Sequence, residues 1–169
     1  MNIKDMKFVI TGSGAGIGAG TAIRAASYGA KVMLSDINDE NGQSVVESIR
    51  AEGGTAFYKH CDVTNENQVK ELMSETEEQL GGIDVLHNNA GIHESMISED
   101  LSLDTMSIET FHKVMDINVT GSWLCAKYAL HYLRKSKYAS IINAGSTSSI
   151  AGYPRSEEHT SELQSRAYL

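Results

Sequence analysis

The chain has 169 residues, which is about the length of one domain. Hydrophobic residues make up 41% of it and charged residues 21%, a globular composition that excludes wholesale disorder. The 14 Lys and Arg against 22 Asp and Glu give a net charge of −8, which disfavours nucleic acid and anionic membrane surfaces as partners. The sequence has neither an apolar run near the ~20 residues of a membrane span nor an evident signal peptide, so we expect a cytoplasmic protein.

Short apolar runs alternate along the chain with longer stretches of helical periodicity. In chain order we predict strand Lys7–Thr11, helix Gly16–Tyr28, strand Lys31–Ser35, helix Asp39–Glu52, strand Thr55–His60, helix Thr64–Leu80, strand Ile83–Asn88, an acidic loop His93–Asp104, helix Ser107–Lys135 and strand Ser140–Ala144. Helices of this length between short strands indicate crossover connections, and therefore a parallel sheet covered by helices.

Two of the predicted helices carry more specific expectations. Thr64 is a plausible N-cap of the third helix. One stripe of that helix has the spacing of a buried face and consists of Val69, Leu72, Met73, Thr76 and Leu80. The helix Ser107–Lys135 is apolar on several sides, so we expect it to be packed on both.

Cysteine and histidine spacing favours neither disulfides nor metal ligation. Cys61 and Cys125 are too few for a disulfide framework, and we interpret them as reduced residues of the core. The six histidines show no HExxH or comparably tight ligand spacing, so we predict no metal site.

Residues 11–18, TGSGAGIG, connect the first predicted strand to the first predicted helix. In this context Gly12 permits a tight turn, Gly16 lets the backbone approach a pyrophosphate, and Gly18 lets helix and strand pack closely. The phosphates would rest on free N–H groups at the positive end of the helix. The loop therefore predicts a dinucleotide site.

An acidic residue follows each of the next two strands. Asp36 ends the second, where a carboxylate can accept both hydroxyls of an adenosine ribose and repel a 2′-phosphate, which favours NAD over NADP. No Arg or Lys lies in the glycine loop or directly after Asp36 to cancel that repulsion. Asp36 also fits the start of a turn, and the two roles are compatible. Asp62 fits either a contact to the adenine edge or a turn carboxylate.

Several spaced motifs together resemble the short-chain dehydrogenase/reductase family. They are TGSGAGIG, Asp36, Cys61-Asp62-Val63, Asn88-Asn89-Ala90-Gly91, Asn118 and Ser146, in that order. The resemblance runs from Met1 to about Pro154 and covers roughly the N-terminal three-fifths of a usual member. It implies an α/β fold with a doubly wound, Rossmann-like parallel sheet of strand order 3-2-1-4-5, truncated before strands 6 and 7. Residues 1–154 would be an incomplete dinucleotide-binding domain.

The resemblance also implies a set of residues around the cofactor. Those lining the pyrophosphate would be Gly12, Ser13, Gly16, Ile17 and Gly18. Asp36 would hold the adenosine ribose, and Asp62 and Val63 would flank the adenine. The end of the fourth strand would lie against the cofactor through Asn89, Ala90 and Gly91.

Two further residues resemble catalytic ones. Asn118 is similar to the family's asparagine, which holds a water in a proton relay. Ser146 is similar to the serine that orients the substrate carbonyl or hydroxyl, with Ser148 and Ser149 as rivals. The implied reaction is NAD-dependent hydride transfer to or from a small-molecule alcohol or ketone, in a parent enzyme that is a homo-oligomer.

The family's proton-transfer pair is missing at its usual spacing. That pair is a tyrosine followed, one helical turn later, by a lysine that lowers the tyrosine pKa. The expected window after Ser146 holds Glu158, His159 and Thr160 instead. Tyr153 comes too early and is followed one turn later by Glu157, whose charge would raise a tyrosine pKa. We therefore expect little or no catalysis by this chain, and a non-catalytic NAD-binding module is the alternative.

The C-terminal residues break the pattern of the chain. Arg155–Ser165 reads RSEEHTSELQS, which resembles the translation of a common sequencing adapter. We therefore predict that 155–169 are a foreign or disordered tail, with an ordinary polar helix as the alternative. Truncation there would leave the fifth strand as an apolar edge and expose a face of the long helix, so we expect a poorly soluble product.

Overall fold

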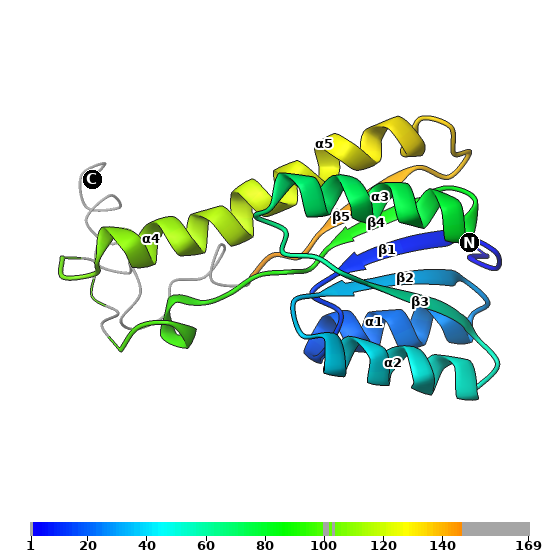
Figure 1. Cartoon of the computed structure of the whole chain (residues 1–169), viewed down its shortest axis with the longest axis horizontal. Coiled ribbons are helices and arrows are strands. Elements are labelled where there is room, and N and C mark those ends of the chain that lie inside the picture. The colour runs from blue at the N-terminus through cyan, green and yellow to red at the C-terminus, as the bar shows by residue number, and fades with distance from the viewer. Residues whose placement is uncertain (1, 100–101, 103, 147–169) are drawn as a thin grey trace, which may run out of the picture.

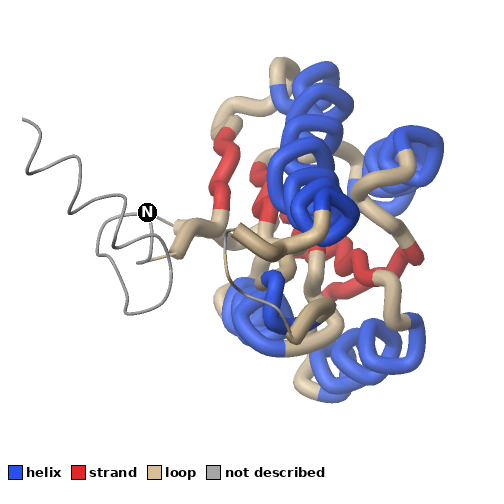
Figure 2. Tube along the Cα trace, turned by 90° about the vertical axis from the view of Figure 1, so that its left-hand side faces the viewer, coloured by secondary structure: helices blue, strands red, loops and turns tan. Residues whose placement is uncertain are grey.

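The structure, a computed structural model, describes residues 2–99, 102 and 104–146. Five strands form one sheet in the order β3-β2-β1-β4-β5, and every neighbouring pair is parallel. Helices cover both faces of this sheet, with α1 and α2 on one face and α3 and α5 on the other (Figure 1). Figure 2 shows the same layers from the side. The predicted doubly wound parallel sheet and its strand order are confirmed.

The elements of the structure lie close to their predicted bounds. The strands are β1 (Lys7–Thr11), β2 (Lys31–Asp36), β3 (Thr55–His60), β4 (Val85–Asn88) and β5 (Ser140–Asn143). The helices are α1 (Gly16–Ser27), α2 (Asp39–Ala51), α3 (Glu66–Leu80), the short η1 (Glu94–Met96), α4 (Ile108–Met115), the π-helical η2 (Asp116–Gly121) and α5 (Ser122–Leu133). The one-turn helix η1 was not expected, because the loop that contains it has no periodicity.

The core consists of two apolar layers, one on each face of the sheet. Because successive side chains of a strand point to opposite faces, Val9 of β1 packs with α3 and α5 while its neighbours Phe8 and Ile10 pack with α1 and α2. Strands covered on both faces are apolar on both faces, which is why the middle of β1 (Phe8, Val9, Ile10) and of β2 (Val32, Met33, Leu34) is continuously apolar.

The start of α3 differs from the expectation. Asn65 is its N-cap, and the Asn65 side chain accepts hydrogen bonds from the backbone N–H groups of Asn67 and Gln68 at 3.1 and 3.2 Å. Thr64 instead donates to the carboxylate of Asp62 at 2.8 Å. The predicted apolar stripe of this helix is confirmed, since all five of its residues are buried.

The segment predicted as one long helix is continuous but not uniform. Between α4 and α5 the π-helical η2 widens the helix, and α4 extends past the carboxyl ends of the strands (Figure 1). The expectation of packing on both sides is wrong for the described residues. Trp123, Val119 and Phe111 remain 58%, 52% and 49% exposed, because the helix packs on the domain through one face of α5.

Strand β5 forms one edge of the described sheet. It pairs with β4, and all four of its residues are exposed, including the apolar Ile141 and Ile142. An apolar edge at this strand was predicted. Unpaired apolar strands at a sheet edge favour association with other chains.

His87 is the one titratable residue on β4. Its side chain is 7% exposed, and its Nδ1 atom has no hydrogen-bond partner within the described part of the chain. Burial lowers the pKa of this imidazole, because a charged ring loses solvation inside the protein.

The burial of His87 predicts a loss of stability in acid. The unfolded chain binds a proton here near pH ~6.5, while the folded chain binds it only at lower pH. Above that pH His87 is neutral in both states, so its burial does not lower the free energy of unfolding. Below it, the free energy of unfolding falls as the pH decreases, by at most about 1.4 kcal/mol per pH unit. Urea unfolding across this range will show a flatter pH dependence for His87→Leu than for the wild type. Equal slopes would contradict the assignment.

Candidate functional site

The carboxyl ends of the parallel strands meet at one edge of the sheet. The glycine loop follows β1, Asp36 ends β2, Asp62 follows β3 and Asn89 follows β4. Ligands of open α/β sheets bind in the crevice outside these strand ends, so the topology brings the predicted residues to the expected edge.

The glycines of the loop are required for different structural reasons. A Cβ atom at Gly12 would lie 2.7 Å from the Cα of Ala90, and one at Gly18 would lie 2.3 Å from the carbonyl oxygen of Gly12. These two glycines allow the close packing that the sequence predicts. Gly16 has a φ of +54°, and a Cβ there meets no atom within 4 Å, so this glycine borders open space.

Helix α1 begins in the loop without a capping side chain. Its N-cap is Ala15, which makes no side-chain cap hydrogen bond, and its first turn contains no acidic residue. Helices α2 and α3 are capped by Asn38 and Asn65 and have acidic first turns. The start of α1 therefore keeps the positive end of its dipole uncompensated, which favours an anion. Ile17 lies beside it with 77% of its surface exposed.

Ser13 differs from the expectation that it lines a pyrophosphate. Its side chain is fully buried, and its hydroxyl donates to the carbonyl of Ser35 at 3.2 Å and accepts from the N–H of Ser35 at 2.8 Å. The backbone N–H of Ser13 also donates to the carbonyl of Ser35, at 3.0 Å, so both the hydroxyl and the N–H of this residue join the loop to β2.

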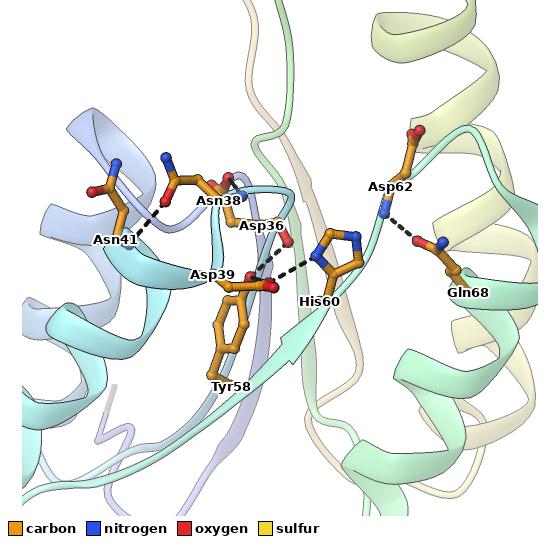
Figure 3. A network of polar contacts seen from close by, with 8 residues as sticks. All are labelled: Asp36, Asn38, Asp39, Asn41, Tyr58, His60, Asp62 and Gln68. Atoms are coloured by element: carbon orange, nitrogen blue, oxygen red, sulfur yellow. Dashed lines mark hydrogen bonds and ion pairs between the residues drawn. The ribbon is translucent and has the colours of Figure 1, made fainter.

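Asp36 faces the glycine loop. One carboxylate oxygen accepts from the N–H of Gly14 at 2.8 Å, and the other accepts from the N–H of Asn38 at 3.0 Å (Figure 3). The first contact places the carboxylate beside the loop, and the second makes it part of the turn before α2. The turn role considered from the sequence is therefore confirmed, and the carboxylate lies at the glycine loop.

Asp62 and Val63 are less clearly placed for a ligand. Asp62 accepts from the N–H and the hydroxyl of Thr64 at 2.9 and 2.8 Å, so it has the turn role. Its own N–H donates to the side chain of Gln68 at 2.7 Å (Figure 3). The side chain of Val63 is buried, and a Cβ at Gly121 would lie 2.6 Å from it, so Val63 belongs to the core.

The segment after β4 holds the glycine loop in place. The side-chain amide of Asn89 donates to the carbonyls of Thr11 and Gly12 at 3.1 and 2.9 Å. The hydroxyl of Thr11 accepts from the N–H groups of Asn89 and Ala90, both at 3.1 Å. Sequence reasoning missed Thr11, whose signal is a hydroxyl residue at the last position of a buried strand.

Asn118 lies in η2, and both the oxygen and the nitrogen of its side-chain amide are hydrogen-bonded to Ile92. Its oxygen accepts from the N–H of Ile92 and its nitrogen donates to the carbonyl of Ile92, both at 2.8 Å. A Cβ at Gly91 would lie 3.2 Å from the same oxygen. The side chain of Asn118 thus joins η2 to the segment after β4, and one amide proton and one oxygen lone pair remain for a further contact.

Ser146 is exposed and follows β5 at the same edge of the sheet. The end of β5 is tied to β4 by the side chain of Asn88, which donates to that of Asn143 at 2.9 Å. The rival serines and the window of the expected tyrosine lie outside the described residues.

The buried thiols of Cys61 and Cys125 belong to the core. Burial raises their pKa values to about 11 and about 12, so both stay protonated and unreactive near neutral pH. Among the described residues, no group of three His, Cys, Asp or Glu side chains is arranged to hold a metal ion. None of the helices in the described ranges is both long and apolar enough to cross a membrane.

The fold is a Rossmann-like α/β fold, and comparisons with known proteins give its family. Residues 7–160 match the short chain dehydrogenase family, and the chain belongs to that family. It is 40% identical over 152 residues to a 2,5-dichloro-2,5-cyclohexadiene-1,4-diol dehydrogenase of Sphingobium indicum, covering 89% of this chain and 58% of that one. It is 39% identical over 144 residues to the secoisolariciresinol dehydrogenase of Forsythia intermedia, covering 85% and 50%.

A solved structure agrees with these relatives. The crystal structure of a short-chain type dehydrogenase/reductase from Mycobacterium marinum superposes with a TM-score of 0.83 at 31% identity. The match covers 90% of this chain and 60% of that protein. The chain thus spans between half and three-fifths of the length of the relatives it matches.

The packing at Gly18 predicts a marked difference between two neighbouring substitutions in α1. Gly18→Ala forces a methyl group against the carbonyl of Gly12, and we expect a loss of about 1–3 kcal/mol in the free energy of unfolding. Gly20→Ala is the matched control, because its Cβ meets nothing within 4 Å and alanine favours helices. Urea denaturation measures both. Similar stabilities for the two variants would show that the close approach does not exist.

Proposed function

We propose that this chain binds NAD at the carboxyl edge of its sheet and derives from an NAD-dependent short-chain dehydrogenase. The observation that carries this proposal is the uncapped start of α1, open at Gly16, beside the carboxylate of Asp36. An anion fits the former, and the hydroxyls of a ribose fit the latter.

The residues present suit a dinucleotide. The pyrophosphate would lie against the backbone of the loop at Gly12, Gly16, Ile17 and Gly18, while Ser13 holds the loop to β2. Asp36 would accept the hydroxyls of the adenosine ribose. Asp62 and the backbone of Val63 would border the adenine, and the segment Asn89, Ala90 and Gly91 would support the loop and the cofactor from β4.

The charges of this site favour NAD over NADP. A 2′-phosphate would approach the carboxylate of Asp36, and the first turn of α2 adds Asp39 and Glu40. The two residues directly after Asp36 are Ile37 and Asn38, which carry no positive charge. Like charges without a compensating cation oppose phosphate binding.

The parent reaction would be oxidation of a small-molecule alcohol or reduction of the corresponding ketone. Relatives named as dehydrogenases of a cyclohexadiene diol, of secoisolariciresinol and of (+)-borneol support this substrate class. Hydride transfer at a carbinol carbon is the chemistry that NAD supplies when bound. Ser146 would orient the substrate oxygen, and Asn118 would hold a water for the proton relay.

We further propose that residues 1–154 are an incomplete dinucleotide-binding domain and that 155–169 do not belong to it. The absence of a tyrosine and lysine at the family's spacing supports this interpretation, as does the coverage of the relatives. The second candidate, a non-catalytic NAD-binding module, is favoured by the same absence. Sequencing the locus separates them, because an uninterrupted genomic reading through Arg155–Leu169 favours the module.

The role of Asp36 predicts a change in cofactor preference. Asp36→Ala removes the acceptor for the ribose hydroxyls, so we expect NAD⁺ to bind about 10- to 100-fold more weakly, the range of hydrogen bonds to a charged group. NADP⁺ will lose less or will gain, because the repulsion is also removed. Calorimetry with both nucleotides measures the two Kd values. An unchanged NAD⁺ to NADP⁺ ratio would exclude this role.

The missing tyrosine and lysine predict that the 169-residue chain does not turn over substrate. NADH formation, followed by absorbance with a panel of secondary alcohols, is expected to be undetectable with it and measurable with the uninterrupted gene product. In that product Ser146→Ala is expected to lower kcat by about 10²–10⁴-fold, the range of a lost acid–base or orienting group. Turnover by the chain as it stands would refute the need for the pair.

A further inference from the structure

A tyrosine outside the known motifs connects both ends of the turn that carries Asp36. The hydroxyl of Tyr58 on β3 lies 2.8 Å from the carbonyl oxygen of Asp36 and 2.7 Å from a carboxylate oxygen of Asp39 (Figure 3). Asp36 is the last residue of β2 and Asp39 the first of α2, with Ile37 and Asn38 between them. One side chain thus spans the whole β2–α2 turn.

The neighbouring histidine contacts the same carboxylate oxygen as Tyr58. The Nδ1 atom of His60 lies 2.7 Å from the same carboxylate oxygen of Asp39. Because a carboxylate only accepts, this nitrogen carries a proton and donates to Asp39. A carboxylate can accept several hydrogen bonds, so the single proton of the Tyr58 hydroxyl lies between two acceptors, the carboxylate of Asp39 and the carbonyl of Asp36, and bridges them. These contacts with Tyr58 and His60 lower the pKa of Asp39, which keeps it an acceptor.

Helix α2 is built to admit the ring of Tyr58. Gly42 lies inside this helix, where glycine is less favourable than alanine. A Cβ at Gly42 would lie 2.1 Å from the Tyr58 ring, closer than any real contact. The helix therefore carries a destabilising residue at the position that lets the hydroxyl reach the turn.

The carboxylate of Asp36 depends on the same turn. One of its oxygens accepts from Asn38 within the turn, and the other accepts from Gly14 in the glycine loop. Its carbonyl is held from the opposite side by Tyr58 and by the N–H of Cys61 at 3.1 Å. Fixing the carbonyl fixes the plane from which the carboxylate projects toward the loop.

We propose that Tyr58, supported by Asp39 and His60, is a positioning residue that orients Asp36 for the hydroxyls of the adenosine ribose. This inference rests on the proposed NAD site and adds a residue to it that does not touch the cofactor. A positioning role differs from a structural one in a measurable way, because it acts only on the part of the affinity that comes from the ribose hydroxyls.

The test compares two ligands across a set of variants of the full chain. The ligands are NAD⁺ and an NAD⁺ analogue in which both hydroxyls of the adenosine ribose are replaced by hydrogen. Tyr58→Phe removes the hydroxyl and keeps the ring on Gly42. Gly42→Ala keeps the hydroxyl but displaces the ring. Tyr28→Phe is the matched control, since the hydroxyl of Tyr28 contacts Arg24 on α1 and not the turn.

Calorimetric Kd values decide the outcome. We expect Tyr58→Phe and Gly42→Ala to weaken NAD⁺ binding about three- to tenfold, the range of one hydrogen bond. Both are expected to leave the analogue's Kd unchanged, and Tyr28→Phe to leave both ligands unchanged. Thermal unfolding of each variant confirms that it is folded.

Other results overturn the inference in distinguishable ways. Equal weakening of both ligands by Tyr58→Phe means a purely structural role, and no weakening means no role. If the wild type binds NAD⁺ and Asp36→Ala loses it while Tyr58→Phe does not, only this inference fails. If the wild type binds neither ligand, the proposed function fails and this inference fails with it.

Discussion

The structure depends on a close approach of backbones around the loop between β1 and α1. Gly12 touches the segment after β4, and Gly18 touches the carbonyl of Gly12, with no side chain between them. The side-chain amide of Asn89 donates to the carbonyls of Thr11 and Gly12, which restricts the conformations open to the loop. This packing sets where α1 begins, and with it the direction in which the first amides of the helix point.

Most polar side chains at the carboxyl edge of the sheet support the backbone of the loops there. Hydrogen bonds to backbone groups hold the loop and the segment after β4, and they come from the side chains of Thr11, Ser13 and Asn89. The side-chain amide of Asn118 pairs in the same way with Ile92. Polar side chains buried near a backbone segment are stable only when they are paired, so these contacts also rigidify the segment. The groups left facing the crevice are mostly main-chain atoms and the carboxylate of Asp36.

The sequence predicted the layers and the strand order because those depend on local periodicity and on the rules for parallel connections. The glycine loop and the place of Asp36 beside it were predicted because their spacing along the chain is itself the signal. Several contacts were not predicted from the sequence. They are the burial of Ser13 and Val63, the pairing of Asn118 with Ile92 and the contact of Tyr58 with Asp36. Each joins residues far apart in the chain, and nothing in the local pattern distinguishes a serine facing β2 from one facing a ligand. The cap of α3 was misplaced by one residue because Thr64 and Asn65 are both good caps.

The bare start of α1 has a thermodynamic consequence. Asn38 and Asn65 accept hydrogen bonds from first-turn N–H groups of α2 and α3, whereas α1 has no such side chain. If the proposed dinucleotide binds at this loop, its occupancy and the folding of the first helical turn would strengthen each other by mass action. At a free ligand concentration about one hundred times Kd, this linkage is worth about 2.7 kcal/mol, a sizeable share of the stability of a small domain.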